Sequence, residues 1–135
     1  MRDTEKGRAS NQPRKKSTLM SHWERDFRRG VLQLMILLLV RLNTEEAHGY
    51  GLIKLIRDTG VPLKAGTIYP LLKRLENDGL IQSILADDLE HPGQPRRIYT
   101  ITQLGEEVIY DMMEIYQDYN NSIKIWFDEI KKSER

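Results

Sequence analysis

Apolar residues recur at helical spacing from Trp23 to Leu42, which predicts a first helix over this segment. The stripe comprises Trp23, Phe27, Val31, Leu34, Leu38 and Leu42. Between Val31 and Val40 the helix is apolar nearly all round, which is typical of a helix at the centre of a core. This run is about half of the roughly 20 residues that a membrane-spanning helix needs, so we interpret it as a buried core helix.

A second, shorter amphipathic helix is predicted over residues 46–58. Thr44 is a suitable N-cap for this helix, and Gly60 is a suitable stop signal just after its end. Gly49 and Gly51 lie inside it, although glycine is a poor helix former. We therefore expect another backbone to approach this helix closely at the two glycines.

A third helix is predicted over residues 65–78, within the stretch KAGTIYPLLKRLENDG. Pro70 lies in or just after its first turn, where backbone N–H groups lack helical partners. Its inward stripe comprises Ile68, Leu71, Leu72 and Leu75. The remaining face of this helix is polar.

Two short runs of β character follow at residues 80–86 and 96–102, and the turn residues between them predict a hairpin with a long tip. Thr102 then caps a long helix whose apolar positions alternate steps of four and three, as in a coiled-coil seam. The seam comprises Val108, Met112, Ile115, Tyr119, Ile123, Trp126 and Ile130. We expect a second copy of the chain to cover this seam in a two-fold dimer.

Three helices followed by a hairpin is the layout of a winged helix-turn-helix. We therefore predict a mainly α fold with a small β-hairpin: a winged helix-turn-helix domain plus a long C-terminal dimerisation helix. The expected organisation is a flexible basic arm over residues 1–22, the winged domain over 23–102 and the dimerisation helix over 103–135.

The polar face of the third helix carries side chains that suit double-stranded DNA: phosphate donors, readers of base edges and an aromatic ring. These candidates are Lys64, Thr67, Tyr69, Lys73, Arg74 and Asn77. Gln94, Arg96 and Arg97 lie where a wing would meet the DNA backbone or minor groove. A solvated helix with its basic residues paired to Glu76 or Asp78 would show the same pattern, so the spacing alone leaves both interpretations open.

The composition does not indicate an enzymatic function. The chain of 135 residues has no cysteine, which excludes disulfides, thiolate metal sites and cysteine nucleophiles. Its three histidines are far apart and lack metal-binding spacing. We therefore expect no catalytic residue, no metal and no cofactor, and the lack of cysteine suits the reducing cytoplasm.

The net charge of +1 conceals an uneven distribution of charge along the chain. Residues 1–29 hold nine Lys or Arg against four acidic residues, whereas residues 103–135 hold four against eight. A basic arm binds DNA phosphates through counterion release, but a solvated arm has the same composition. The role of the N-terminal arm stays open.

Three motifs, in order and at the expected separations, resemble the PadR family of transcriptional regulators. They are HGYGLIKLI at 48–56, KAGTIYPLLKRLENDGLI at 64–81 and GQPRRIYTITQLG at 93–105. The resemblance covers about residues 27–132. The chain departs from the family pattern at Gly51, where the family usually has Glu, and at Lys64, where it often has a Ser that would cap the helix. On the wing, Arg97-Ile98-Tyr99 also replaces one of two common tyrosines.

The resemblance implies a cytoplasmic, homodimeric winged helix-turn-helix repressor with a recognition helix at 65–78, a wing at 80–102 and a C-terminal dimerisation helix. It places Thr67, Tyr69 and Lys73 on the DNA, and Arg96 and Arg97 on the wing.

Two further hypotheses accompany this interpretation. A protein-binding adaptor could use the same fold without DNA, in which case binding would scarcely respond to salt. Some regulators that resemble this chain release DNA when a small aromatic compound binds near the dimer interface. A candidate effector pocket here comprises Trp23, Tyr116, Tyr119 and Trp126, although the same aromatics could simply fill the dimer core.

Overall fold

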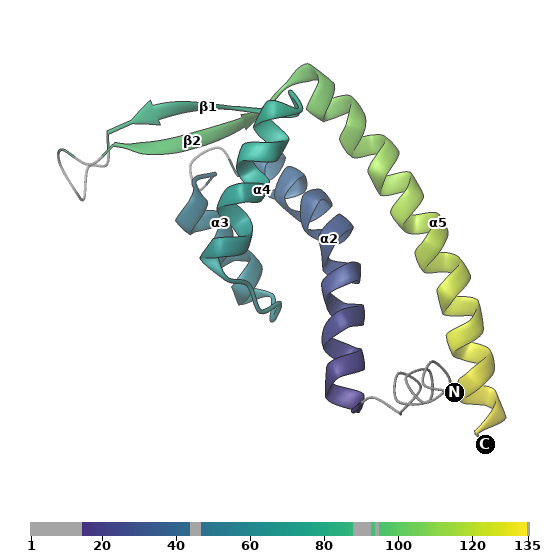
Figure 1. Ribbon diagram of the computed structural model, residues 1–135. Coiled ribbons are helices and arrows are strands. Elements are labelled where there is room, and N and C mark those ends of the chain that lie inside the picture. The colour runs from purple at the N-terminus through teal and green to yellow at the C-terminus, as the bar shows by residue number, and fades with distance from the viewer. Residues whose placement is uncertain (1–14, 44–46, 88–92, 94, 135) are drawn as a thin grey trace, which may run out of the picture. The chain divides into compact units, whose positions relative to one another are not determined.

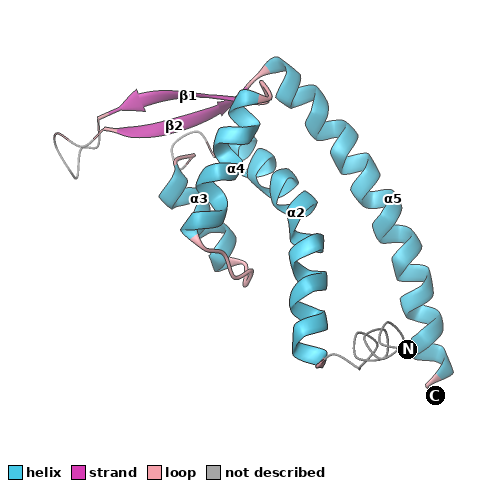
Figure 2. Cartoon of the chain, viewed as in Figure 1, coloured by secondary structure: helices cyan, strands magenta, loops and turns pink. Residues whose placement is uncertain are grey.

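The computed structural model describes residues 15–43, 47–87, 93 and 95–134, and the fold is mainly α with one two-stranded hairpin, as predicted (Figures 1 and 2). In chain order the elements are α2 (Lys16–Leu42), α3 (Gly49–Asp58), α4 (Ala65–Asn77), β1 (Ile81–Ala86), β2 (Arg96–Ile101) and α5 (Gln103–Ser133). Two compact units divide the chain at residues 31 and 32, so α2 begins in one and ends in the other. Within the described residues, no helix is long and apolar enough to span a bilayer.

The N-terminal half of α2 begins earlier than the sequence predicts. The helix starts at Lys16, so the predicted flexible arm over residues 1–22 is wrong for residues 16–22; residues 1–14 lie outside the described part. The Trp23 ring stacks on that of Phe27, with centroids 5.3 Å apart and planes 11° apart. Once a helix exists, each added residue gains a backbone hydrogen bond, so it can extend beyond its apolar stripe.

The second unit has its core between the C-terminal half of α2 and the two shorter helices. Its fully or almost fully buried residues from these helices are Leu32, Ile36, Leu37, Val40, Leu52, Ile53, Ile56, Ile68, Leu72 and Leu75. The predicted role of the run 31–40 as a core helix is therefore confirmed, because its buried residues extend from Leu32 to Val40. Tyr99 from β2 and Ile109 from α5 join the same cluster.

The start of α3 differs from the prediction. The helix begins at Gly49 rather than residue 46, and its N-cap is His48, whose Nδ1 accepts a hydrogen bond of 3.1 Å from the Gly51 N–H. Thr44, the predicted cap, lies outside the described residues. The imidazole makes the same capping contact as a Ser or Thr hydroxyl, which pattern rules do not anticipate. At the other end, Gly60 has a φ of 98°, which confirms the predicted stop.

The hairpin attaches to the helices through its second strand. β1 and β2 pair antiparallel (Figure 2). Their register runs from Ile81 opposite Ile101 to Ala86 opposite Arg96. The Tyr99 N–H donates a hydrogen bond of 2.7 Å to the Ala47 carbonyl, just before α3. The base of the wing is therefore tied to the helix-turn-helix.

α5 is one continuous helix that begins on the core and then leaves it. Thr102 is its N-cap, as predicted, and its Oγ1 accepts a hydrogen bond of 3.0 Å from the Gly105 N–H. Gly105 and Ile109 are its buried residues. Val108 and Met112, predicted to lie in the dimer seam, are partly buried against the core of their own chain. These two residues therefore already contact the core of their own chain, and their place in a dimer seam stays a prediction.

Candidate nucleic-acid interface

The orientation of α4 is set by three buried residues on one side, Ile68, Leu72 and Leu75. The helix starts at Ala65, and its N-cap, Lys64, makes no side-chain capping bond. Pro70 therefore lies just after the first turn. A Cβ atom at Gly66 would have nothing within 4 Å, so the backbone of the first turn is open to a partner.

The polar face of α4 points to solvent. Thr67 is half-buried, and the other predicted DNA contacts on this segment are exposed, namely Lys64, Tyr69, Lys73, Arg74 and Asn77. Among the described residues, neither Lys73 nor Arg74 forms an ion pair with Glu76 or Asp78. The structure thus brings these candidates together on one face and leaves their charges available.

The wing places its two arginines on opposite faces of the hairpin, because neighbouring strand residues alternate. Both arginines are exposed, and Gln94 lies outside the described residues. Arg97 Nη1 donates a hydrogen bond of 3.1 Å to Ser83 Oγ across the strands. Arg97 also shares its face with Tyr99, which is buried, whereas Arg96 lies on the other side.

Tyr99 shows which way that face points. Burial raises the pKa of the Tyr99 phenol, the negative charge of Glu76 and the nearby Tyr69 raise it further, and Arg97 lowers it. Glu76 and Tyr69 both belong to α4. Tyr99 is also buried in the same cluster as Ile68, Leu72 and Leu75 of α4, so the hairpin face that carries Tyr99 and Arg97 is the one that packs on the core.

One close approach was not predicted. A Cβ atom at Gly49 would lie 2.9 Å from Cζ and 3.0 Å from the hydroxyl oxygen of Tyr69, and closer still to Cε1. The prediction that another backbone approaches Gly49 is therefore wrong, because the side chain of Tyr69 makes the close approach. The glycine in HGYG was the available signal, and nothing in the sequence named its partner.

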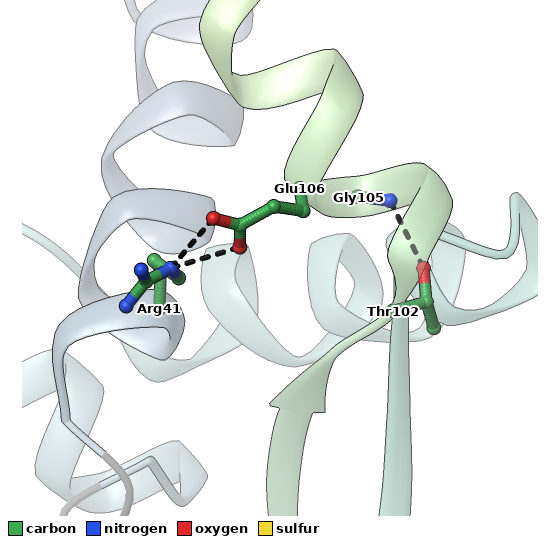
Figure 3. Close-up of polar contacts among 4 residues, drawn as sticks. All are labelled: Arg41, Thr102, Gly105 and Glu106. Carbon is green, nitrogen blue, oxygen red and sulfur yellow. Dashed lines mark hydrogen bonds and ion pairs between the residues drawn. The ribbon is translucent and has the colours of Figure 1, made fainter.

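A shallow pocket lies beside the start of α5, with a volume of about 420 Å³. Its lining comprises Val40, Arg41, Thr100, Ile101, Thr102, Gln103 and Glu106. Arg41 Nε contacts both carboxylate oxygens of Glu106, at 2.9 and 2.8 Å (Figure 3). The hydrogen bond to Glu106, and then its charge, raise the pKa of Arg41.

The four aromatics of the candidate effector pocket do not line that cavity. Trp23, Tyr116, Tyr119 and Trp126 are all exposed in the single chain. Trp23 lies in the first compact unit and the other three in the second. The effector pocket stays a prediction.

Residues 36–111 match the family described as the transcriptional regulator PadR-like family, and this match spans α2 to α5. The chain belongs to the PadR-like family of transcriptional regulators. A transcriptional regulator of Mycobacterium tuberculosis is 35% identical over 85 residues, which are 63% of this chain and 75% of the relative. The resemblance found in the three motifs is confirmed.

Solved PadR structures share the fold. A PadR family transcriptional regulator from Eggerthella lenta superimposes with a TM-score of 0.68 at 30% identity, covering 82% of this chain and 94% of the other. A PadR-like regulator from Bacillus cereus gives a TM-score of 0.64 at 28% identity, covering 76% and 96% of the two chains. This PadR-like chain is accordingly a transcriptional regulator with a DNA-binding winged-helix fold, and not an enzyme.

Proposed function

We propose that the chain is a homodimeric transcriptional repressor that inserts α4 of each subunit into the major groove and acts on the chromosome in the cytoplasm. The observation that carries this proposal is the exposed polar face of α4, where Lys73 and Arg74 make no ion pair in the described part of the chain. Unpaired basic side chains on a helix that the core holds rigidly can contact phosphates and base edges without first breaking a bond.

In this arrangement, Arg97 of the wing contributes more to DNA binding than Arg96 does. Arg97 lies on the hairpin face of Tyr99, whose buried cluster includes residues of α4, so one DNA surface can meet both elements. Its bond to Ser83 spans the strands near the tip and orients the guanidinium. Arg96 lies on the opposite face and therefore serves as the matched control for a wing contact.

The dimer would form through the part of α5 that its own core leaves bare. The remaining residues of the predicted seam are all exposed, namely Ile115, Tyr119, Ile123, Trp126 and Ile130. An apolar stripe of this length is typical of a helix–helix interface. A two-fold dimer then requires a pseudo-palindromic operator with half-sites about 10 bp, or a small multiple of it, apart.

A small aromatic effector would release the protein from DNA. Its support is the exposure of Trp23, Tyr116, Tyr119 and Trp126, because exposed aromatic rings stack on flat ligands. Quenching of tryptophan fluorescence by a panel of flat aromatic compounds tests it. A compound that quenches the fluorescence but leaves DNA binding unchanged would contradict the effector role.

The direct test of DNA binding is a titration of DNA from upstream of the chain's own gene at two salt concentrations. Affinity should fall steeply with salt, with a log–log slope of roughly −0.9 for each phosphate neutralised. Lys73→Ala and Arg97→Ala should each weaken binding and reduce the slope, while Arg96→Ala and Lys131→Ala, which remove the same charge elsewhere, should do so less. Binding that ignores salt would instead favour a protein-binding adaptor.

A further inference from the structure

The contact between Gly49 and Tyr69 joins the first residue of α3 to the polar face of α4. The atoms nearest to the missing side chain are Cε1, Cζ and the hydroxyl oxygen, so the outer end of the Tyr69 ring covers Gly49. The ring therefore extends from its own helix across to the neighbouring one. Tyr69 nevertheless remains 50% exposed, which leaves part of the ring free for a ligand.

We propose that Gly49 is a positioning residue for DNA recognition. Because Gly49 has no side chain, the outer end of the Tyr69 ring packs against it, and this contact orders the ring before DNA binds. This inference rests on the proposed role of α4 in the major groove. An aromatic side chain that is already ordered loses less conformational entropy on binding than one that must be ordered. Gly49 would thus act on DNA through Tyr69 and not by contact.

The backbone does not explain glycine at this position. Positive φ angles among the described glycines occur at Gly60, Gly79 and Gly93, and Gly49 is not one of them. Alanine is the better helix former, so helix propensity alone would favour Gly49→Ala. The contrast with Gly66 in the first turn of α4, where a Cβ would meet nothing within 4 Å, shows that the restriction at Gly49 comes from the tyrosine ring.

The test is a double-mutant cycle in DNA affinity with wild type, Gly49→Ala, Tyr69→Ala and the double variant. The probe is a duplex that the wild-type protein selects from a randomised oligonucleotide library, measured at one salt concentration by fluorescence anisotropy. Gly49→Ala should weaken binding by about 2- to 10-fold, the cost of ordering one side chain. In the Tyr69→Ala background the same change should have no further effect, because the ring that it displaces is gone.

The control is Gly30→Ala, at a helical glycine where a Cβ would meet nothing within 4 Å, and it should leave affinity unchanged in both backgrounds. If Gly49→Ala lowers DNA affinity equally in the wild-type and Tyr69→Ala backgrounds, the inference is overturned and the proposed function stays intact. A wild-type protein that selects no duplex would overturn both.

A second measurement does not depend on the variants folding. In the free wild-type protein, nuclear Overhauser effects should connect the Gly49 Hα protons to the Tyr69 Hε protons, because these atoms lie in contact. The effects should persist in Gly30→Ala. If they are missing in the free protein, the ring is not held before DNA binds, and the inference fails.

Discussion

The two ends of α5 differ sharply in what surrounds them. The first turns lie on the core, with Gly105 and Ile109 buried and Val108 and Met112 partly so. From Met113 to Glu134, by contrast, every residue is exposed, although many of them are large and apolar. One end is therefore specified by contacts within the chain, and the other presents large apolar side chains that are exposed.

The buried end shows how tightly a helix start can be specified. The Leu80 carbonyl accepts a hydrogen bond of 3.1 Å from the Thr102 N–H and also lies against the Cα of Gly105, where a Cβ would collide with it. Thr102 Oγ1 donates a further bond of 2.6 Å to the Gly79 carbonyl. The backbone at 79–80 therefore fixes where α5 begins, whereas the described residues make no comparable contact with its far half.

The largest expected effect comes from a charge placed in the exposed half. Ile115→Asp should convert the proposed dimer to monomers, because it removes an apolar contact from both copies and buries two like charges. Burial of an isoleucine contributes about 1.5–3 kcal/mol per copy, so association should weaken by at least 100-fold. Sedimentation velocity across a concentration series measures this change.

Gln117→Asp is the control for Ile115→Asp, because it adds the same charge at a nearby exposed polar position. It should leave the dimer intact. If both variants sediment as wild type, the exposed stripe of α5 is not the dimer contact.

The second effect lies at the buried end. Gly105→Ala should lower the free energy of unfolding by about 1–3 kcal/mol, since overpacking against the fixed backbone carbonyl of Leu80 costs this much. The new Cβ would lie 2.7 Å from Cδ1 of Ile101 and would also meet the Leu80 carbonyl. Urea denaturation measures the change, and Gly30→Ala, in open space, should be neutral or stabilising. A Gly105→Ala protein as stable as wild type would contradict the packing described.

The sequence predicts most of the elements because local rules decide them. The helical spacing of its apolar residues is enough to predict the buried face of α4, and Ile68, Leu72 and Leu75 are indeed buried. Thr102 and Gly60 mark helix boundaries because a cap and a left-handed glycine are local requirements. The polar face of α4 follows from the same periodicity, so its exposure was predictable, but its use on DNA was not.

Features that depend on tertiary contacts escaped prediction. The four-three spacing did not indicate that Val108 and Met112 pack partly against the core of their own chain, because periodicity alone does not identify what covers an apolar stripe. The Tyr69 ring over Gly49 joins residues of two helices, and no local rule pairs them. The start of α2 was missed because residues 16–22 extend a helix that is anchored farther along the chain.

The smallest expected effect is at the ion pair between Arg41, at the end of α2, and Glu106, in the first turn of α5 (Figure 3). The pair is partly exposed, so salt should screen much of its attraction, and it should add less to the buried end of α5 than Gly105 does. A double-mutant cycle of Arg41→Gln and Glu106→Gln in urea denaturation should show a favourable coupling at low salt that largely disappears in 1 M salt. The Gly105→Ala effect should not change with salt, because it arises from packing. A coupling that survives high salt would mean that the Nε hydrogen bonds, and not the charges, hold the two helices together here.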